Sequence, residues 1–350
     1  MLEEDTKQIG LEDIREGSEE YSLKYPLTYA QERISKECAD SIRYTNVLLH
    51  CVCGAGKTEL VVESISRMLK EKKKVCFAIP RRQVVLELKE RLSKYFAKAK
   101  VIAVCGGHTD IVDGDLIICT THQLYRYYKA FDLLILDEPD AFPFKGNPVL
   151  HGIAKTSTKN RIIYMTATID EYLLDACAKG DMKVLTLKQR PHGKPLPVPR
   201  QIVAPKSVLL YQLIRWIDRY KNHPRMIFVP TIRIAKELAF FLKLFYPECL
   251  LCTSQSEDKD RIIYQFRKKK QGLIVTTTVL ERGVTILDAQ ICVFLANHSV
   301  FDKASLIQIA GRAGRNFKHP YGDVLFLCNE IKETTLACIQ EIEGDNRCAV

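Results

Sequence analysis

The 350-residue sequence lacks several features that define large classes of proteins. It has no apolar run near the ~18 residues that a membrane-spanning helix needs, which argues against integral insertion in a bilayer. Its first ten residues, MLEEDTKQIG, are acidic and lack the apolar core of a secretory signal, so we expect a cytosolic protein. Short internal repeats and low-complexity tracts are also absent. The composition, 47% hydrophobic and 27% charged, is that of a globular chain long enough for two domains.

The thirteen cysteines lack the spacing of a zinc site. The close pairs are Cys51 with Cys53 and Cys249 with Cys252, and neither has a second pair at zinc-finger distance. Most of the others stand inside apolar runs such as VCFAIP and LIICTT, where a thiol behaves as a small hydrophobic group in a reducing compartment. We therefore expect buried cysteines and no structural zinc.

The net charge of +10 is unevenly placed along the chain. Residues 1–23 hold eight acidic and two basic side chains, so they contribute −6 and the remainder carries +16. We expect residues 1–23 to form a solvated, poorly ordered tail. The basic remainder suits a polyanionic partner such as nucleic acid.

Short β-branched runs alternate with helical patterns from about residue 45 onward. Between residues 57 and 70, one helical stripe collects Leu60, Val61, Ile65, Met68 and Leu69. Such alternation predicts parallel strands joined by crossover helices, an α/β fold. The expected strands of the first half are 47–51, 74–80, 100–105, 115–121, 131–137, 161–167 and 183–187.

A proline-rich stretch, RPHGKPLPVPR at residues 190–200, interrupts this alternation and predicts a linker. We therefore expect two α/β domains in tandem, residues 24–190 and 201–350, with the linker at 191–200. The second half resumes with expected strands at 225–230, 249–254, 272–278, 291–296 and 322–328, and with helices at 206–221, 231–245, 258–270, 302–314 and 330–343.

The sequence CGAGKT at residues 53–58 follows the apolar run VLLHC and precedes an amphipathic helix. This is the setting of a phosphate-binding loop, although Cys51 stands where the P-loop pattern has its first glycine. The glycines allow backbone N–H groups to approach a phosphate, the lysine reaches the β- and γ-phosphates, and the threonine hydroxyl ligates Mg²⁺. The predicted nucleotide-binding residues are Gly54, Ala55, Gly56, Lys57 and Thr58.

A cluster of carboxylates, DEPD at residues 137–140, follows the apolar run FDLLIL. Carboxylates at the end of a strand lie where ligands bind in open α/β sheets. Asp137 would hold Mg²⁺ through water, and Glu138 would orient and deprotonate the water that attacks the phosphate. An acidic turn that only caps a strand is the alternative, and the phosphate loop 80 residues upstream argues against it.

Two further groups of polar residues follow. Thr166 and Thr168 end the run RIIYM, where we expect them to hydrogen-bond to the acidic cluster and relay between the nucleotide and a second ligand.

Gln308, Arg312 and Arg315 fall on a helical pattern, with the arginines projecting from one face at i and i+3. Guanidinium groups pair with phosphate oxygens in a bidentate way. Solvated surface arginines are the alternative, which does not explain the glutamine and the two glycines around them.

Together these motifs resemble the motor core of superfamily 2 helicases, the DEAD/DEAH-like group with two RecA-like domains. The motifs LTYAQ (27–31), CGAGKT, DEPD, TAT, FVPT (228–231), TTTVLERGVT (276–285) and QIAGRAGR (308–315) follow one another in that family's order. The resemblance implies a nucleic-acid-stimulated ATPase that uses ATP and Mg²⁺ bound in a cleft between the domains. It implies Gln31 as the adenine reader and Gly283 as a nucleotide contact. The implied contacts to the strand's backbone are Arg81, Arg82, Gly107, Thr121, Thr231 and Thr277.

Within that superfamily, the stretches DEPDAFPF, RPHGKPLPVP, TTTVLERGVT and QIAGRAGR are most similar to the ComFA family of late-competence ATPases. This resemblance implies a cytosolic motor, peripheral at the inner face of the membrane, that pulls incoming single-stranded DNA through a membrane channel. Members usually carry a four-cysteine zinc module before the motor, whereas an acidic tail precedes Leu27 here. DEPD differs from DEAD at its third position, which bears no catalytic side chain.

Other functions stay open from the sequence alone. A PriA-like replication-restart helicase or an RNA helicase fits the same motifs, because none of them reads the sugar 2′-OH, so RNA is not excluded as a partner. A nucleotide-gated scaffold at a membrane channel is a third hypothesis. The intact Glu138 and Arg315 disfavour it.

Overall fold

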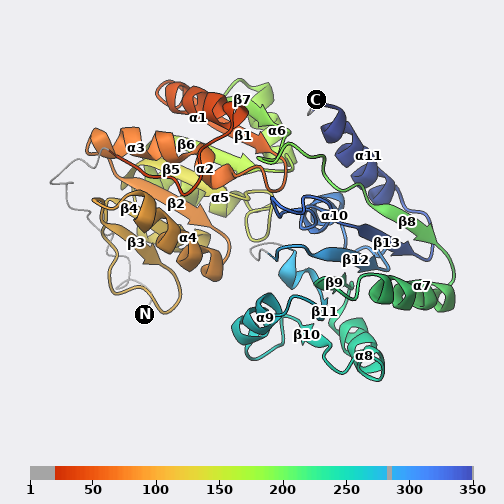
Figure 1. Cartoon of the computed structure of the whole chain (residues 1–350). Helices are drawn as coiled ribbons and strands as arrows, with labels where there is room; N and C mark the ends of the chain where they lie inside the picture. Colours follow the sequence, from red (N-terminus) through yellow and green to blue (C-terminus); the bar gives the residue numbers. More distant parts are fainter. Residues whose placement is uncertain (1–19, 282–285, 349–350) are drawn as a thin grey trace. The chain divides into compact units, whose positions relative to one another are not determined.

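The computed structural model describes residues 20–281 and 286–348 and divides the chain into two compact units, Met1–Leu187 and Lys188–Val350 (Figure 1). Most of the predicted acidic tail, residues 1–19, and the predicted nucleotide contact Gly283 lie outside the described residues. The proline-rich segment, defined here as residues 188–199, contains no helix or strand and belongs to the second unit.

The first unit is a seven-stranded sheet in the order β3-β4-β2-β5-β6-β1-β7, in which every neighbouring pair is parallel. All seven predicted strands are present. Its strands are β1 (Asn46–Cys51), β2 (Val75–Ile79), β3 (Val101–Val104), β4 (Leu116–Thr120), β5 (Phe131–Asp137), β6 (Thr158–Thr166) and β7 (Met182–Leu187).

Helices cover both faces of this sheet. Right-handed crossovers place α3 and α4 on one face, and η1, α5 and α6 on the other. The predicted stripe on residues 57–70 is confirmed, because its five members are at most 8% exposed. The helices are α1 (Tyr29–Ser41), α2 (Lys57–Leu60), α3 (Val62–Lys70), α4 (Arg82–Tyr95), α5 (Pro148–Ser157) and α6 (Glu171–Ala178), with the 3₁₀-helix η1 at Thr121–Arg126.

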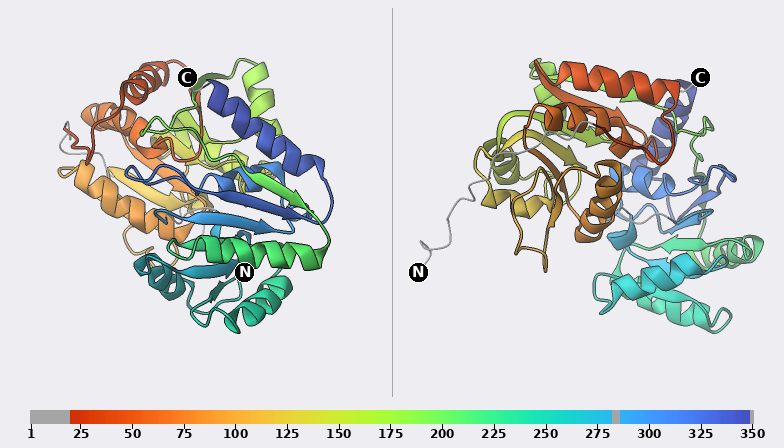
Figure 2. Two further views of the ribbon diagram at one scale, coloured as in Figure 1. Left: turned by 45° about the vertical axis from the view of Figure 1, so that its right-hand side comes forward. Right: turned by 60° about the vertical axis from the view of Figure 1, so that its left-hand side comes forward.

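The second unit is a six-stranded parallel sheet in the order β10-β11-β9-β12-β13-β8. Figure 2 shows α7, in green, lying along its strands, where Leu213 and Trp216 enter the core together with residues of α8. The strands are β8 (Arg200–Val203), β9 (Arg225–Phe228), β10 (Leu250–Cys252), β11 (Leu273–Thr276), β12 (Gln290–Phe294) and β13 (Val324–Cys328). The helices are α7 (Lys206–Arg219), α8 (Ile232–Lys243), α9 (Lys259–Lys268), α10 (Lys303–Ala310) and α11 (Glu333–Cys348), with η2 at Thr278–Leu280.

The parallel direction of the strands decides where chemistry gathers. Because the carboxyl ends of parallel strands meet at one edge, the loops that follow β1, β2, β3, β4, β5 and β6 all lie along one edge of the first sheet. The phosphate loop, the acidic cluster and the TAT motif belong to three of these loops. The fold therefore brings the predicted nucleotide-binding motifs of the first unit together.

Candidate active site and nucleic-acid interface

The phosphate loop is a tight turn between β1 and α2. Gly54 has φ 84° and Gly56 has φ 81°, a left-handed backbone that glycine adopts without steric cost. Cys51 and Cys53 are 0% and 4% exposed, which confirms the prediction that they are buried packing residues. The loop therefore presents backbone N–H groups at the start of α2, as a phosphate site requires.

Gln31 packs directly against this loop. Its Nε2 donates a hydrogen bond to the Ala55 carbonyl at 2.8 Å, and its Oε1 accepts one from the backbone N–H of Thr28 at 3.0 Å. A Cβ atom added at Gly56 would stand 2.6 Å from Gln31 Nε2. Gln31 thus supports the loop in this structure, and its reading of adenine stays a prediction.

Lys57 is half-buried at the first position of α2, opposite the acidic cluster. Burial acts to lower the pKa of its ammonium, but the negative charges of Asp137 and Glu138 act in the other direction, and the pKa of Lys57 is raised overall. Lys57 is therefore charged at neutral pH and suited to a phosphate. Beside it, Thr58 Oγ1 accepts a hydrogen bond at 2.9 Å from Arg91 of α4, an interaction that the sequence did not predict.

The acidic cluster begins at the last residue of β5. Asp137 ends the strand, and Glu138 follows with φ 55°, an uncommon left-handed conformation for a side-chain-bearing residue. The backbone N–H of Glu138 donates to the Met165 carbonyl of β6 at 2.9 Å, which holds this turn in place. Such strain persists where surrounding contacts enforce it, and it is frequent at functional sites. Both carboxylates are half-buried.

The TAT motif is joined to the fourth residue of DEPD. Thr166 Oγ1 donates to Asp140 Oδ1 and Thr168 Oγ1 donates to Asp140 Oδ2, both at 2.6 Å. All three residues are at most 6% exposed. The prediction that these hydroxyls bond to the acidic cluster is confirmed. Their partner, Asp140, had no role in the sequence analysis.

These residues also fit a magnesium-bound nucleotide. A threonine hydroxyl and carboxylates are the hard oxygen ligands that Mg²⁺ takes, and Lys57 lies within the field of the same carboxylates. The two left-handed glycines supply the cradle for phosphate oxygens. The donor set of the first unit is therefore that of a P-loop ATPase site.

Two of the segments implied to contact a nucleic-acid strand meet at the edge of the first sheet. Arg82 Nε donates to the Gly106 carbonyl at 2.7 Å, and Gly107, with φ 79°, lies beside the same guanidinium. Arg81 caps the start of α4 with extended backbone. Thr121, by contrast, is fully buried in η1, so its side chain offers no exposed atom to a strand in this structure.

The second unit places Thr231 and Thr277 after β9 and β11, which are neighbouring parallel strands, so both residues lie at one edge of that sheet. Thr231 Oγ1 accepts from the Ile234 backbone N–H at 3.2 Å and caps α8. Thr277 is 7% exposed. Contact of either residue with a strand stays a prediction.

The prediction that Arg312 and Arg315 project from one face of a helix is wrong. Helix α10 ends at Ala310, and the arginines lie in the turn that follows, defined here as the arginine turn (residues 311–315). Gly311 caps the helix, and within the turn Gly314 takes φ 65°, a left-handed conformation that glycine adopts without steric cost. Arg312 is 3% exposed, and Arg315 Nε donates to the Gly311 carbonyl at 2.9 Å. Gln308, still in the helix, is 4% exposed.

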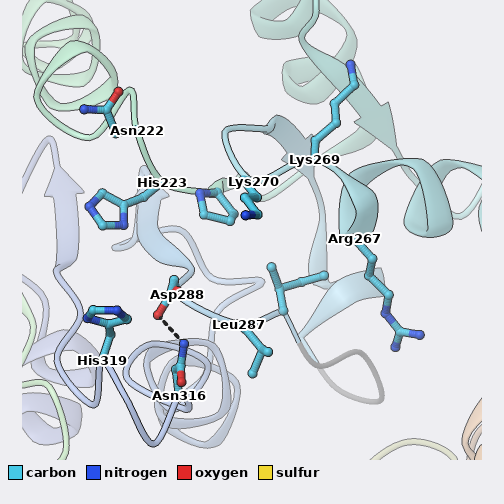
Figure 3. Close-up of a pocket in the computed structure, with 11 residues that line it drawn as sticks. Asn222, His223, Arg267, Lys269, Lys270, Leu287, Asp288, Asn316 and His319 are labelled. Atoms are coloured by element: carbon cyan, nitrogen blue, oxygen red, sulfur yellow. Dashed lines mark hydrogen bonds between the residues drawn. The ribbon is translucent and has the colours of Figure 1, made fainter.

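A pocket of about 600 Å³ lies elsewhere in the second unit (Figure 3). Its lining residues precede β9, β11, β12 and β13, which places it at the amino-terminal edge of the sheet, opposite Thr231 and Thr277. In Figure 3, Arg267 and Lys269 extend away from the space beside His223 and His319. The pocket is therefore separate from the predicted strand-binding edge. Its lining residues include Asn222, Lys270, Leu287, Asp288 and Asn316.

Among residues 20–281 and 286–348, no helix is long and apolar enough to cross a membrane.

Known proteins resemble both halves of this chain. Residues 24–171 match the family described as "Type III restriction enzyme, res subunit", and residues 205–317 match "Helicase conserved C-terminal domain". Over 336 residues the chain is 35% identical to "Competence protein ComFA" of Streptococcus pneumoniae, covering 92% of this chain and 77% of that protein. Over 315 residues it is 35% identical to the protein of the same description from Bacillus subtilis, covering 86% and 68%.

Solved structures share the fold. The structure described as "S. cerevisiae Dbp5 bound to RNA and ADP BeF3" matches with a TM-score of 0.69 at 18% identity, covering 92% of this chain and 88% of that one. The "Structure of RecG bound to three-way DNA junction" matches with a TM-score of 0.64 at 21% identity, covering 92% and 47%. These likenesses confirm the predicted fold class of two tandem RecA-like domains.

Proposed function

Because this chain belongs to the ComFA family within the superfamily 2 helicases, we propose that it is a motor that translocates on single-stranded DNA and drives DNA uptake during competence. Its two helicase domains make it an ATP-hydrolysing helicase that uses ATP and Mg²⁺. The DNA-uptake role is supported by 35% identity to two competence proteins. The structural observation that carries the proposal is the shared sheet edge of the phosphate loop, the acidic cluster and the TAT motif.

Each residue of that edge has one task in the proposal. Lys57 binds the β- and γ-phosphates with its charged ammonium, and the N–H groups of the loop bind the phosphate oxygens. Thr58 and Asp137 would hold Mg²⁺, which neutralises charge on the phosphates when it is bound. Glu138, fixed by its backbone hydrogen bond to Met165, orients and deprotonates the attacking water.

The second unit contributes Gln308, Arg312 and Arg315 to the same reaction in this proposal. Arginines that meet the γ-phosphate stabilise the charge of its transfer, and hydrolysis removes their partner. Gly283 belongs to the same predicted set. Formation and release of this interaction would drive closing and opening of the two units around ATP and ADP.

The proposed interactions with the strand are non-specific for base sequence. Arg81, Arg82 and Gly107 of the first unit, with Thr231 and Thr277 of the second, would bind the phosphates of the strand. Because Thr121 is buried, we assign it the support of η1 beneath this surface. In this proposal the motor acts in the cytosol, at the inner face of a membrane DNA channel.

The decisive measurement is the rate of ATP hydrolysis with and without single-stranded DNA, with RNA of the same length in parallel. We expect stimulation by DNA that exceeds stimulation by RNA. Lys57→Ala and Glu138→Gln should each lower kcat by about 10²-fold or more. Lys94→Ala is the matched control, because Lys94 pairs with Glu90 on the exposed surface of α4. Equal stimulation by RNA would favour the RNA-helicase alternative. A Lys57→Ala variant that hydrolyses ATP at the wild-type rate would contradict the proposed mechanism.

A further inference from the structure

The buried guanidinium of Arg190 binds the arginine turn through three backbone carbonyls. Its Nη1 donates to the carbonyls of Ala313 and Gly314, both at 2.8 Å, and its Nη2 donates to that of Gly311 at 2.9 Å. Arg190 is 3% exposed. A charge buried to this extent is costly unless its N–H groups are all matched, so the interaction is part of the fold and not a chance surface pairing.

The carbonyls that Arg190 binds have no partner in a regular element. Helix α10 ends at Ala310, so the carbonyls at 311, 313 and 314 lie beyond its hydrogen-bond ladder. The planar fork of a guanidinium can reach several carbonyls at once, and the negative end of the helix dipole favours a cation there. Arg190 therefore supplies hydrogen-bond donors to the carbonyls of the turn that follows α10.

The same segment closes the turn from a second side. His192 Nε2 lies 3.1 Å from the Gly314 carbonyl. A Cβ atom added at Gly314 would stand 2.5 Å from the Pro320 carbonyl oxygen and 3.2 Å from Pro197 Cγ. Gly314 is thus closely surrounded by Pro320, by Pro197 of the proline-rich segment and by the Arg190 guanidinium, and it has no space for a side chain.

The proline-rich segment is itself anchored to α11. The Leu196 backbone N–H donates to Asn346 Oδ1 at 2.7 Å, and Asn346 Nδ2 donates back to the Leu196 carbonyl at 2.9 Å. Lys188 Nζ pairs with Asp345 at 3.0 Å. Arg190 follows Leu187, the last residue of β7 and of the first unit, by three positions. The connection between the units is therefore a fixed strap on the second unit from its first residue onward.

We propose that Arg190 is a positioning residue for ATP hydrolysis, acting through Arg312 and Arg315. By holding the carbonyls of the arginine turn, it sets the place of both guanidinium groups. This inference rests on the proposed function, in which the two arginines meet the γ-phosphate. Arg190 itself is assigned no contact with the nucleotide.

The test compares Arg190→Gln and Arg190→Lys with Arg225→Gln. Arg225 is a matched control because it is also 3% exposed and donates to two carbonyls, of Ile217 and Gln271, away from the arginine turn. We expect Arg190→Gln to lower kcat about 10²-fold, as for a catalytic group displaced by about 1 Å, with little change in the Kd of a non-hydrolysable ATP analogue. Arg190→Lys should not restore kcat, because an ammonium lacks the fork. Arg225→Gln should lower Tm and leave kcat unchanged at 25 °C.

A double-mutant cycle then asks whether Arg190 acts through the arginines. In an Arg312→Ala/Arg315→Ala background, Arg190→Gln should cause no further fall in kcat. An equal further fall, or a fall of kcat in Arg225→Gln as large as in Arg190→Gln, would overturn the inference, as would full activity of Arg190→Gln. If Arg190→Gln does not fold, His192→Ala removes one interaction with Gly314 and must show the same non-additivity. The proposed function would instead be overturned if nucleic acid did not stimulate the ATPase rate of the wild type and if Lys57→Ala hydrolysed ATP as fast as the wild type.

Discussion

Thr168 donates its hydroxyl to Oδ2 of Asp140 at 2.6 Å, across 28 residues of sequence, inside the core of the first unit. Thr166 binds the other oxygen of the same carboxylate, so one aspartate joins the loop after β5 to the loop after β6. Hydrogen bonds to a buried carboxylate are among the stronger ones in proteins. These two hydrogen bonds therefore fix the position of the TAT motif relative to Asp137 and Glu138.

Removing one hydroxyl should weaken this tie. We expect Thr168→Val to lower the free energy of unfolding by about 1.5–3 kcal/mol, because the Asp140 carboxylate loses a charge-assisted hydrogen bond without a replacement. Thr168→Ser keeps the hydroxyl and loses only a buried methyl group, so it should lower the free energy of unfolding by no more than about 1 kcal/mol. Urea unfolding of the three proteins measures the difference. Stimulation of ATPase by DNA should also fall in Thr168→Val, and equal stimulation in all three proteins would contradict the coupling role.

Gly56 should tolerate no side chain. Alanine there would adopt φ 81° and would place its Cβ 2.6 Å from Gln31 Nε2, so Gly56→Ala should lower both Tm and ATP affinity. Gly146 is the matched control, since it has φ 68° but no heavy atom within 4 Å of an added Cβ. Gly146→Ala should therefore show the backbone cost alone, about 1–2 kcal/mol.

The clash at Gly56 can be separated from the strain. In a Gln31→Ala background, the loss of Tm caused by Gly56→Ala should shrink to that caused by Gly146→Ala. Thermal unfolding of the four single and double variants measures this. The same loss of Tm in both backgrounds would show that the clash with Gln31 is not what excludes a side chain at Gly56.

Most of the fold follows from the pattern of apolar residues, because strands buried on both faces of a parallel sheet read as continuous apolar runs. Strand β2, with every residue buried, is such a run. Strand β8 escaped prediction because it is a four-residue edge strand, partly exposed, that follows four prolines. The helix predicted to end at 314 ends instead at Ala310, where Gly311 follows as its cap and Gly314 takes a left-handed backbone.

The candidate site was predictable where its residues are adjacent in sequence and lie at the end of a strand, as in the phosphate loop and DEPD. Contacts between distant residues were predictable only in part. The threonines of the TAT motif are expected to bond to the acidic cluster, but nothing in local spacing singles out Asp140 as their partner or indicates that Arg190 binds carbonyls more than 120 residues away. Such partners are decided by tertiary packing, which a local pattern does not contain.

Arg81 and Arg82 should contribute electrostatically to binding of the strand. For single strands, the slope of log K against log salt changes by about 0.7 for each phosphate that the protein no longer neutralises. We therefore expect Arg81→Ala/Arg82→Ala to bind single-stranded DNA more weakly and to reduce that slope by about 1.4 if both side chains meet phosphates. Lys94→Ala again serves as the surface control. Fluorescence anisotropy over a salt series gives both quantities, and an unchanged slope would show that neither arginine meets a phosphate.

His151 should make the first unit sensitive to acid. Its ring is 5% exposed, stacks on Tyr172 at 3.8 Å and meets the edge of Phe144 at 5.1 Å, and neither ring nitrogen has a hydrogen-bond partner among the described residues. Burial is the main cause that lowers the pKa of His151 below its ordinary value. The unfolded chain binds a proton near the ordinary pKa of about 6.5, whereas the folded chain binds it only at lower pH.

The sign of the effect follows from this difference. Above about pH 6.5 both states are neutral at His151, and below it the free energy of unfolding falls with pH, by at most about 1.4 kcal/mol per pH unit for this one group. His151→Phe keeps the ring packing and removes the titration, so it should flatten part of the fall between pH 7.5 and 5.5. Some fall should persist, because burial also lowers the pKa of His192. Urea unfolding at pH 7.5 and 5.5 measures the fall in the free energy of unfolding, and a His319→Phe variant at an exposed position is the control. An equal fall in the wild type and in His151→Phe would exclude His151 as the cause.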